Sequence, residues 1–152
     1  MAYTSAEGRQ QLLDGLADAI EELAFALAAL GAAYEQLDDA TADKLEEDLF
    51  GPAQVAYGRA KRTYAGFADR HGLPARTFPP AEPGLPSTGA RGFIDSAMSA
   101  AAGAGEALAG VQDSPESLEV GDAELRAGLA EVRGLVDGLA PAARELTRRL
   151  GR

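Results

Sequence analysis

Residues 13–37, LDGLADAIEELAFALAALGAAYEQL, determine the fold that this sequence predicts. Large side chains recur in this segment at alternating intervals of three and four residues, at Leu13, Leu16, Ile20, Leu23, Leu27, Leu30, Tyr34 and Leu37. An unbroken heptad pattern of this length is typical of a long helix that packs in a bundle or a coiled coil. Ser5 is a good N-cap with Glu7 in the first turn, so we expect the first helix over residues 5–39.

A second helix is expected over residues 41–71. Thr41 is its predicted N-cap, which leaves a connection of only a few residues, and short connections make neighbouring helices antiparallel. Pro52 removes one hydrogen bond inside this helix, so we expect a kink or a short separate first piece. The sequence His71-Gly-Leu-Pro74 predicts the end of the helix, because its glycine suits the left-handed cap and its proline prevents continuation.

A proline-rich linker is expected over residues 73–87. It contains five of the eight prolines of the chain, at Pro74, Pro79, Pro80, Pro83 and Pro86. Such a segment is extended or polyproline-like, and it runs either along the length of the molecule or across one end of it. The Pro-x-x-Pro spacing is also typical of segments that dock to aromatic grooves, but a stiff linker explains these prolines without a partner.

Two further helices are expected over residues 88–112 and 122–150. The middle of the first is rich in Ala and Gly, which favours the close approach of a neighbouring helix. Between the two helices, Pro115 stands at the first position of a short helical turn. The last helix is capped near Asp122 and repeats the heptad pattern, and we expect Pro141 to kink it without ending it.

Four amphipathic segments without strand-like alternation predict a single all-α domain over residues 1–152. The expected architecture is an up-down-up-down four-helix bundle with a long Pro-rich connection between its second and third helices. Antiparallel packing of the first two helices would place the basic side chains of the second beside the acidic start of the first. These groups are Arg59, Lys61, Arg62 and Arg70 on one side and Asp14, Asp18, Glu21 and Glu22 on the other.

The composition of the chain limits the classes of binding partner and the cellular location that we expect. The chain has 24 acidic and 14 basic residues, a formal net charge of −10 and no cysteine. We therefore expect no nucleic-acid partner, no disulfide bond and no thiolate zinc site. The uncharged stretch at residues 23–34 is shorter than the roughly 20 residues of a membrane span, and the N-terminal residues do not resemble a signal peptide. The expected protein is soluble and cytoplasmic, and it has no membrane partner.

The turn between the first two helices, residues 35–48, is strongly acidic. Its only base is Lys44, and its acids are Glu35, Asp38, Asp39, Asp43, Glu46, Glu47 and Asp48. A calcium loop aligned on Asp39 fails, because it would need Gly at Lys44 and a bidentate Glu at Phe50. A solvated turn is the favoured interpretation, and a loose site for a divalent cation or a basic partner is the alternative.

Motifs for catalysis are missing from the sequence. Ferritin-like di-iron bundles use two Glu-x-x-His motifs, whereas Ala68 stands three residues before His71, the only histidine. The chain also lacks a Gly-x-Ser-x-Gly motif and a phosphate-binding glycine-rich loop. We therefore predict no catalytic, metal-binding or cofactor-binding residues and do not expect an enzyme.

An aromatic stripe, Tyr57, Tyr64 and His71, follows one face of the second helix at intervals of seven residues. In one interpretation, the rings fill space opposite the small residues of the third helix. In the other, the hydroxyls and the imidazole line a ligand pocket between helices, where bundles commonly bind small molecules.

A second apolar face on the first helix consists of Phe25, Ala28, Ala29 and Ala32. A helix that is apolar all round is usually buried all round, so this face suggests self-association with Phe25 as its anchor. The alternative is an Ala-rich face that tolerates water. The leading functional hypothesis is non-catalytic protein association, with the chain as a homodimer. The alternative hypothesis is small-molecule binding at the aromatic stripe.

Overall fold

The computed structural model describes residues 4–84 and 89–150. Within these ranges the secondary structure is helical without any strand, which confirms the all-α prediction. The elements are α1 (Ser5–Tyr34), α2 (Asp39–Leu45), the π-helix η1 (Glu46–Phe50), α3 (Gly51–Arg70), α4 (Gly89–Asp113), α5 (Pro115–Glu119), α6 (Ala123–Asp137) and α7 (Leu139–Leu150). The predicted start of a helix at residue 88, and Pro86 of the proline motif, lie outside the described residues.

The N-terminal ends of α1 and α2 are capped one and three residues earlier than predicted. Thr4, not Ser5, accepts the hydrogen bond of the Glu7 backbone N–H, at 3.1 Å. Asp38 caps α2 by accepting the backbone N–H of Thr41 at 2.8 Å, and this bond lowers the pKa of the Asp38 carboxyl. Both helix starts contain several adjacent residues whose side chains could act as caps. The residue that acts as the cap lies three positions before the backbone N–H that its side chain accepts.

A π-helical turn precedes Pro52. The Gly51 N–H donates to the carbonyl of Glu46, five residues back, and α3 then begins with Pro52 at its second position. Proline has no N–H to donate to the carbonyl four residues back, and the wider turn accommodates this missing hydrogen bond. The helix is therefore divided before Pro52. At its other end, Gly72 adopts a φ of 66°, and the Leu73 N–H donates to the Ala68 carbonyl at 2.8 Å, as the glycine cap predicts.

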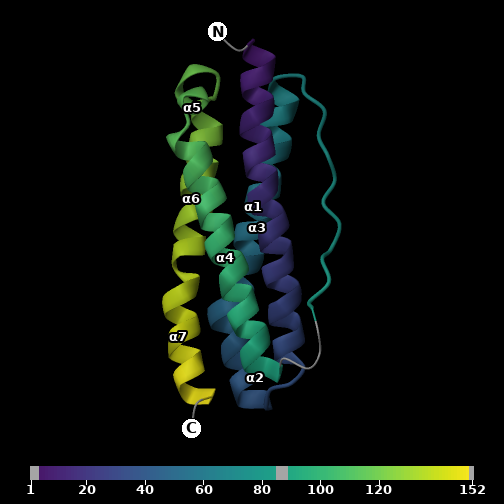
Figure 1. The fold of residues 1–152 in the computed structure, drawn as a ribbon, viewed down its shortest axis with the longest axis vertical. Coiled ribbons are helices and arrows are strands. Elements are labelled where there is room, and N and C mark those ends of the chain that lie inside the picture. Colours follow the sequence, from purple (N-terminus) through teal and green to yellow (C-terminus); the bar gives the residue numbers. More distant parts are fainter. Residues whose placement is uncertain (1–3, 85–88, 151–152) are drawn as a thin grey trace.

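The chain forms two helical hairpins that pack against each other. The first consists of α1 and the α2–η1–α3 segment, and the second consists of α4 and the α6–α7 segment (Figure 1). In the contact between α1 and α4, Val111 lies over Gly15 and Glu22 lies over Gly103, so these helices are antiparallel. Helices α3 and α6 are also antiparallel. The start of α3 lies near the C-terminal end of α6, which Gly138 caps, and Arg70 at the end of α3 binds Asp122 at the start of α6.

The predicted up-down-up-down order is wrong at the linker, because α4 runs in the same direction as α3. Residues 73–84 form no helix or strand and extend along α1 from the end where α3 stops towards the end where α4 starts (Figure 1). At about 3.1 Å per extended residue, the described residues 73–84 span about 37 Å. The 30 residues of α1 span about 45 Å at about 1.5 Å each, so the described part of the linker can run along most of the length of α1.

The last helical segment is interrupted at Gly138, not kinked at Pro141. Asp122 caps α6 by accepting the Leu125 N–H at 2.8 Å, as expected, and α6 ends at Asp137. Pro141 has no N–H for the carbonyl four residues back, and its ring clashes with that carbonyl. The helix therefore ends at Asp137 and restarts at Leu139.

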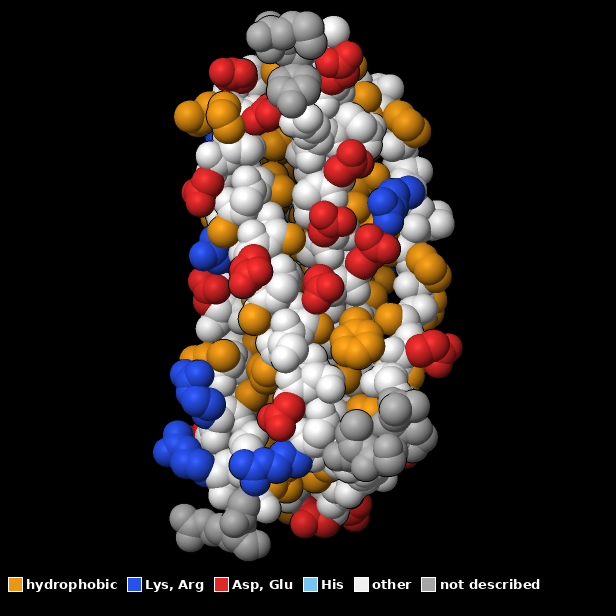
Figure 2. Space-filling model, viewed as in Figure 1, with side chains coloured by type: hydrophobic (Ala, Val, Ile, Leu, Met, Phe, Trp, Pro, Cys, Tyr) orange, Lys and Arg blue, Asp and Glu red, His pale blue; other side chains and the backbone are white. Residues whose placement is uncertain are grey.

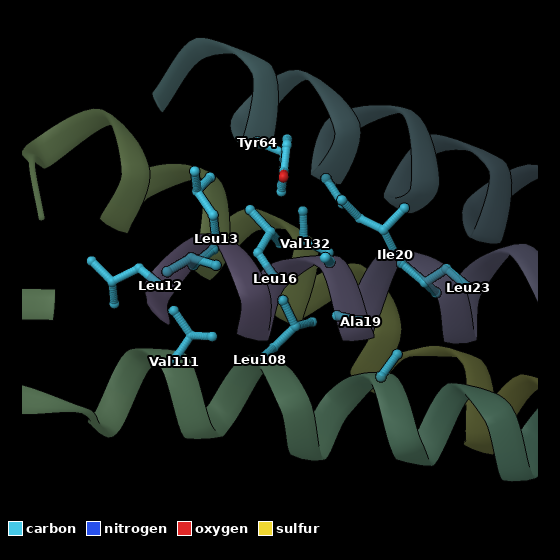
Figure 3. Packing of buried hydrophobic residues seen from close by; sticks show 14 of the residues in the cluster. Leu12, Leu13, Leu16, Ala19, Ile20, Leu23, Tyr64, Leu108, Val111 and Val132 are labelled. Carbon is cyan, nitrogen blue, oxygen red and sulfur yellow. The ribbon is translucent and has the colours of Figure 1, made fainter. Parts of the chain in front are cut away.

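Two clusters of buried side chains fill the space between the hairpins. Figure 3 shows one of them, where Leu16 and Ile20 of α1 meet Tyr64, Leu108 and Val132 from the surrounding helices. The other lies towards the acidic turn and contains Leu30, Leu45, Leu49, Phe93, Ile94, Leu139 and Leu146. None of the helices in the described part of the chain has a segment long and apolar enough to span a membrane.

Candidate functional site

A groove with a volume of about 600 Å³ lies between α4 and α7. Its floor is apolar, since Ile94 and Ala143 are buried and Met98 is half-buried. Its polar lining comes from Arg91 and Asp95 on α4 and from Arg144, Thr147 and Arg148 on α7. We call these residues the α4/α7 groove.

Helical spacing places the polar side chains along the two edges of this groove. Arg91 and Asp95 are one turn apart on α4, and Arg144 and Arg148 are one turn apart on α7, so each pair lies on one face of its helix. Ala140 also lines the groove, and its short side chain leaves open the space between the helices. The result is a channel with an apolar floor, a cationic edge on α7 and an edge of mixed charge on α4.

The charge of the groove contrasts with that of the chain. It has three arginines and one acid in its lining, although the whole chain carries −10. Arg148 lies 2.7 Å from the Glu145 carboxylate, and both side chains are largely exposed, so this pair contributes little to stability. Figure 2 shows basic side chains gathered over the lower part of α7, while acidic side chains are spread over α1 and α4.

The groove is suited to binding an acidic partner. Guanidinium groups form paired hydrogen bonds with carboxylates or phosphates, and an apolar floor accepts an aliphatic or aromatic side chain. Within the described ranges, no group of three His, Asp or Glu side chains is placed to hold a metal ion.

The aromatic stripe is distributed over three different surroundings. Tyr64 is buried, and its ring meets that of Phe78 in a T-shaped contact with centroids 5.2 Å apart. Tyr57 lies beneath the Lys61 ammonium, which is 4.2 Å from the ring centroid, and it lines a cavity of about 370 Å³ beside the linker. The imidazole of His71 lies 2.9 Å from the Asp122 carboxylate. The structure therefore places only Tyr57 of these three at that cavity.

Asp122 connects the end of α3 to the start of α6. Arg70 donates two hydrogen bonds to its carboxylate, at 2.9 and 3.0 Å, and His71 approaches the same group. The Arg70 guanidinium, together with the Leu125 N–H and His71, holds the pKa of the Asp122 carboxyl far below its usual range. The same contact raises the pKa of Arg70. This network gives His71 a structural role at a helix junction.

The Asp122 network predicts a specific loss of stability in acid. A carboxyl with a lowered pKa in the folded state stabilises the protein above its unfolded pKa of about 3.9, and this contribution is lost as the pH falls further. Asp122→Asn keeps a capping side chain but removes the charge. We expect the variant to be less stable than the parent near neutral pH and the difference to shrink progressively below about pH 4.

Urea denaturation at several pH values, followed by far-UV circular dichroism, measures this difference. Glu106→Gln is the matched control, because Glu106 is an exposed carboxylate on α4. A difference between Asp122→Asn and the parent that stays constant into strong acid would contradict the prediction.

The second apolar face of α1 is largely covered. Ala29 is fully buried, and Phe25 is half-buried and lies beside Ser96 and Ser99 of α4. Ala28 borders the cavity beside the linker, while Ala32 packs against the core cluster nearest the acidic turn. Ala29 therefore cannot take part in the predicted self-association face, because it is buried in the core cluster that α1 forms with α4.

The acidic turn is stabilised by ordinary surface contacts. Asp38 is the cap of α2, and Lys44 forms an ion pair with Asp48 at 3.1 Å. The predicted alternative of a cation site has no matching cluster of ligands in the described part of the chain. Six acids of the turn are exposed, and these are Glu35, Asp38, Asp39, Asp43, Glu46 and Glu47.

The groove is a site that the sequence alone does not predict. The four-residue spacing of Arg144 and Arg148 is visible in the sequence, but it identifies a site only once α4 is known to lie opposite α7. That pairing depends on the direction of the linker, which the prolines leave open. No family model matches this chain, and neither a curated protein nor a solved structure matches it.

Proposed function

We propose that residues 1–152 form one four-helix bundle domain with a single long crossover. Its helices are α1, the α2–η1–α3 segment, α4 and the α6–α7 segment. Antiparallel packing of α1 on α4 and of α3 on α6 supports this arrangement, as do core clusters that draw on both hairpins. Helical bundles with one long crossover connection are an established architecture.

We propose that the protein acts by non-catalytic protein association and forms a homodimer through the α4/α7 groove. The observation that carries this proposal is an apolar floor edged by Arg91, Arg144 and Arg148 on an acidic molecule. Arginine is enriched among the residues that dominate binding energy at interfaces, and such residues act best around a desolvated apolar centre. A groove of this size forms only part of a stable interface, which buries about 800 Å² on each partner.

Native mass spectrometry and sedimentation equilibrium test the proposal. We expect the parent protein to be a dimer and Arg144→Glu to raise its dissociation constant about tenfold or more, because a like charge then faces the acidic partner. Arg62→Glu is the matched control, since Arg62 is an exposed arginine of α3 outside the groove, and it should leave the dimer unchanged.

A further variant separates the groove from the α1 face. Phe25→Gln should leave the dimer intact if the groove is the interface. It should yield a monomer if the Phe25, Ala28 and Ala32 surface is the interface. A dimer that tolerates Arg144→Glu as well as it tolerates Arg62→Glu would overturn the assignment to the groove.

The cavity beside Tyr57 supports small-molecule binding as a second candidate function. Its walls are mainly apolar, from Leu27, Phe78 and Pro80, and Lys61 adds a cation at the edge. These features suit a small apolar acid. A monomer that carries additional mass in the native spectrum would favour this function over association.

A further inference from the structure

The acidic turn, residues 35–48, and the α4/α7 groove lie at the same end of the molecule. Helix α2 and the C-terminal end of α7 are both at the lower end in Figure 1. The side chain of Gln36 lies beside Gly89, at the start of α4, two residues before Arg91. One end of the protein therefore carries a strongly acidic surface and a basic groove close together.

These opposite charges do not neutralise each other within one chain. In the described part of the chain, the ion pairs of this end join Lys44 to Asp48 and Arg148 to Glu145, and none joins the turn to the groove. The exposed acids of the turn and the arginines Arg91 and Arg144 thus remain available to another molecule.

We infer that the partner in the groove is the acidic turn of a second copy of this chain, with the two copies related by a two-fold axis. The inference rests on the proposed function and specifies which surface fills the groove. Because the turn and the groove share one end, a two-fold rotation brings each turn to the groove of the other copy. The contact is then made twice and closes as a dimer, without open-ended growth.

Two apolar side chains, one immediately before the turn and one within it, suit the apolar floor of the groove. Tyr34 is 37% exposed at the end of α1, and Leu37 is half-buried next to the acids. The half-buried Met98 on the floor is flexible enough to pack against such side chains. Apolar contact supplies affinity at this interface, while the charges fix the register of the two copies.

The total charge of −10 on each copy opposes dimerisation, but mainly through distant groups. At physiological ionic strength, interactions between exposed charges are screened beyond about 8 Å. The acids and arginines in direct contact lie within this distance, and there the attraction of opposite charges prevails.

Charge reversal on each side of the contact tests the inference. The groove variant is Arg91→Glu/Arg144→Glu, and its new acid at position 91 would lie near the N-terminal end of α4, where the helix dipole favours an acid. The turn variant is Asp43→Lys/Glu47→Lys, and Glu106→Lys is its control because Glu106 is exposed outside the turn. Circular dichroism verifies that every variant keeps the helical content of the parent.

We expect each double variant to dimerise about tenfold or more weakly than the parent, while the Glu106→Lys control dimerises normally. An equimolar mixture of the two double variants should form a heterodimer, because one contact keeps the original charges and the other has both charges reversed. The variants differ in mass, so native mass spectrometry separates the heterodimer from both homodimers.

The remaining outcomes distinguish this inference from the proposed function. A dimer that is weakened by the groove variant but not by the turn variant would overturn the inference and retain the groove as the interface. A dimer that is insensitive to the groove variant, or a monomeric parent protein, would overturn both. Failure of the mixture to form a heterodimer would overturn the pairing of turn with groove.

Discussion

Phe67→Ala is expected to lower the free energy of unfolding by about 3–5 kcal/mol. Phe67 is fully buried in the core cluster around Leu13, Leu16 and Ile20 of α1, and it is among the largest side chains of the described residues with no exposure. Its removal loses the transfer free energy of the ring and leaves a cavity between rigid helices. Its ring also contacts His71, with centroids 4.6 Å apart.

Equilibrium denaturation in urea, followed by circular dichroism, measures this loss. Phe78→Ala is the matched control, because Phe78 is only partly buried and lies on the linker against Tyr64. We expect the control to lose about 1 kcal/mol, in line with a partly exposed aromatic contact. Equal losses for the two variants would contradict the placement of Phe67 in the core.

Gly128→Leu is expected to lower the free energy of unfolding by about 3 kcal/mol, because α3 and α6 approach each other closely there. A Cβ atom at Gly128 would lie 2.7 Å from Cγ2 of Thr63 and would also collide with its hydroxyl oxygen. Thr63 is buried, and its hydroxyl donates to the Arg59 carbonyl at 2.8 Å, so it has little freedom to move away.

Gly134→Leu in the same helix is the control for this prediction. A Cβ atom at Gly134 would meet no neighbouring atom within 4 Å, and the residue is exposed. Leucine has a higher helix propensity than glycine, so this variant should gain up to about 0.8 kcal/mol. Thermal and urea denaturation should therefore show changes of opposite sign, and two changes of the same sign would contradict the close approach at Gly128.

Local features of this fold can be predicted from the sequence because they depend on neighbouring residues. Five positions of the predicted heptad are buried in α1, at Leu13, Leu16, Ile20, Leu23 and Leu30, whereas Leu27 is half-buried and Tyr34 is exposed. Gly72 marks the end of α3, and Asp122 marks the start of α6. Each of these signals acts within one or two helical turns. Pro141 is harder to interpret, since the sequence shows that a hydrogen bond is lost but not that the helix breaks at Gly138.

The direction of α4 and the candidate site cannot be predicted in the same way. A proline-rich segment of this length fits either a crossing or a return to the same end, and the choice decides which helices face each other. The burial of Ala29 and the groove edged by Arg91 and Arg144 both follow from that choice. The sequence pattern predicts that the aromatic stripe forms one surface. In the structure, Tyr64 is buried in the core and His71 contacts Asp122.

The crossing linker also determines how the chain assembles. Each hairpin brings together helices that are close in sequence, joined by residues 35–38 in the first and by residues 114–122 in the second, so its formation requires only modest loop closure. Packing α1 against α4 instead pairs residues that are far apart in sequence, such as Gly15 and Val111. Such long-range contacts slow folding, because the chain loses conformational entropy before the contacts form and stabilise it. The two hairpins are therefore the natural early units of folding, and their docking across the linker is the step that completes the core.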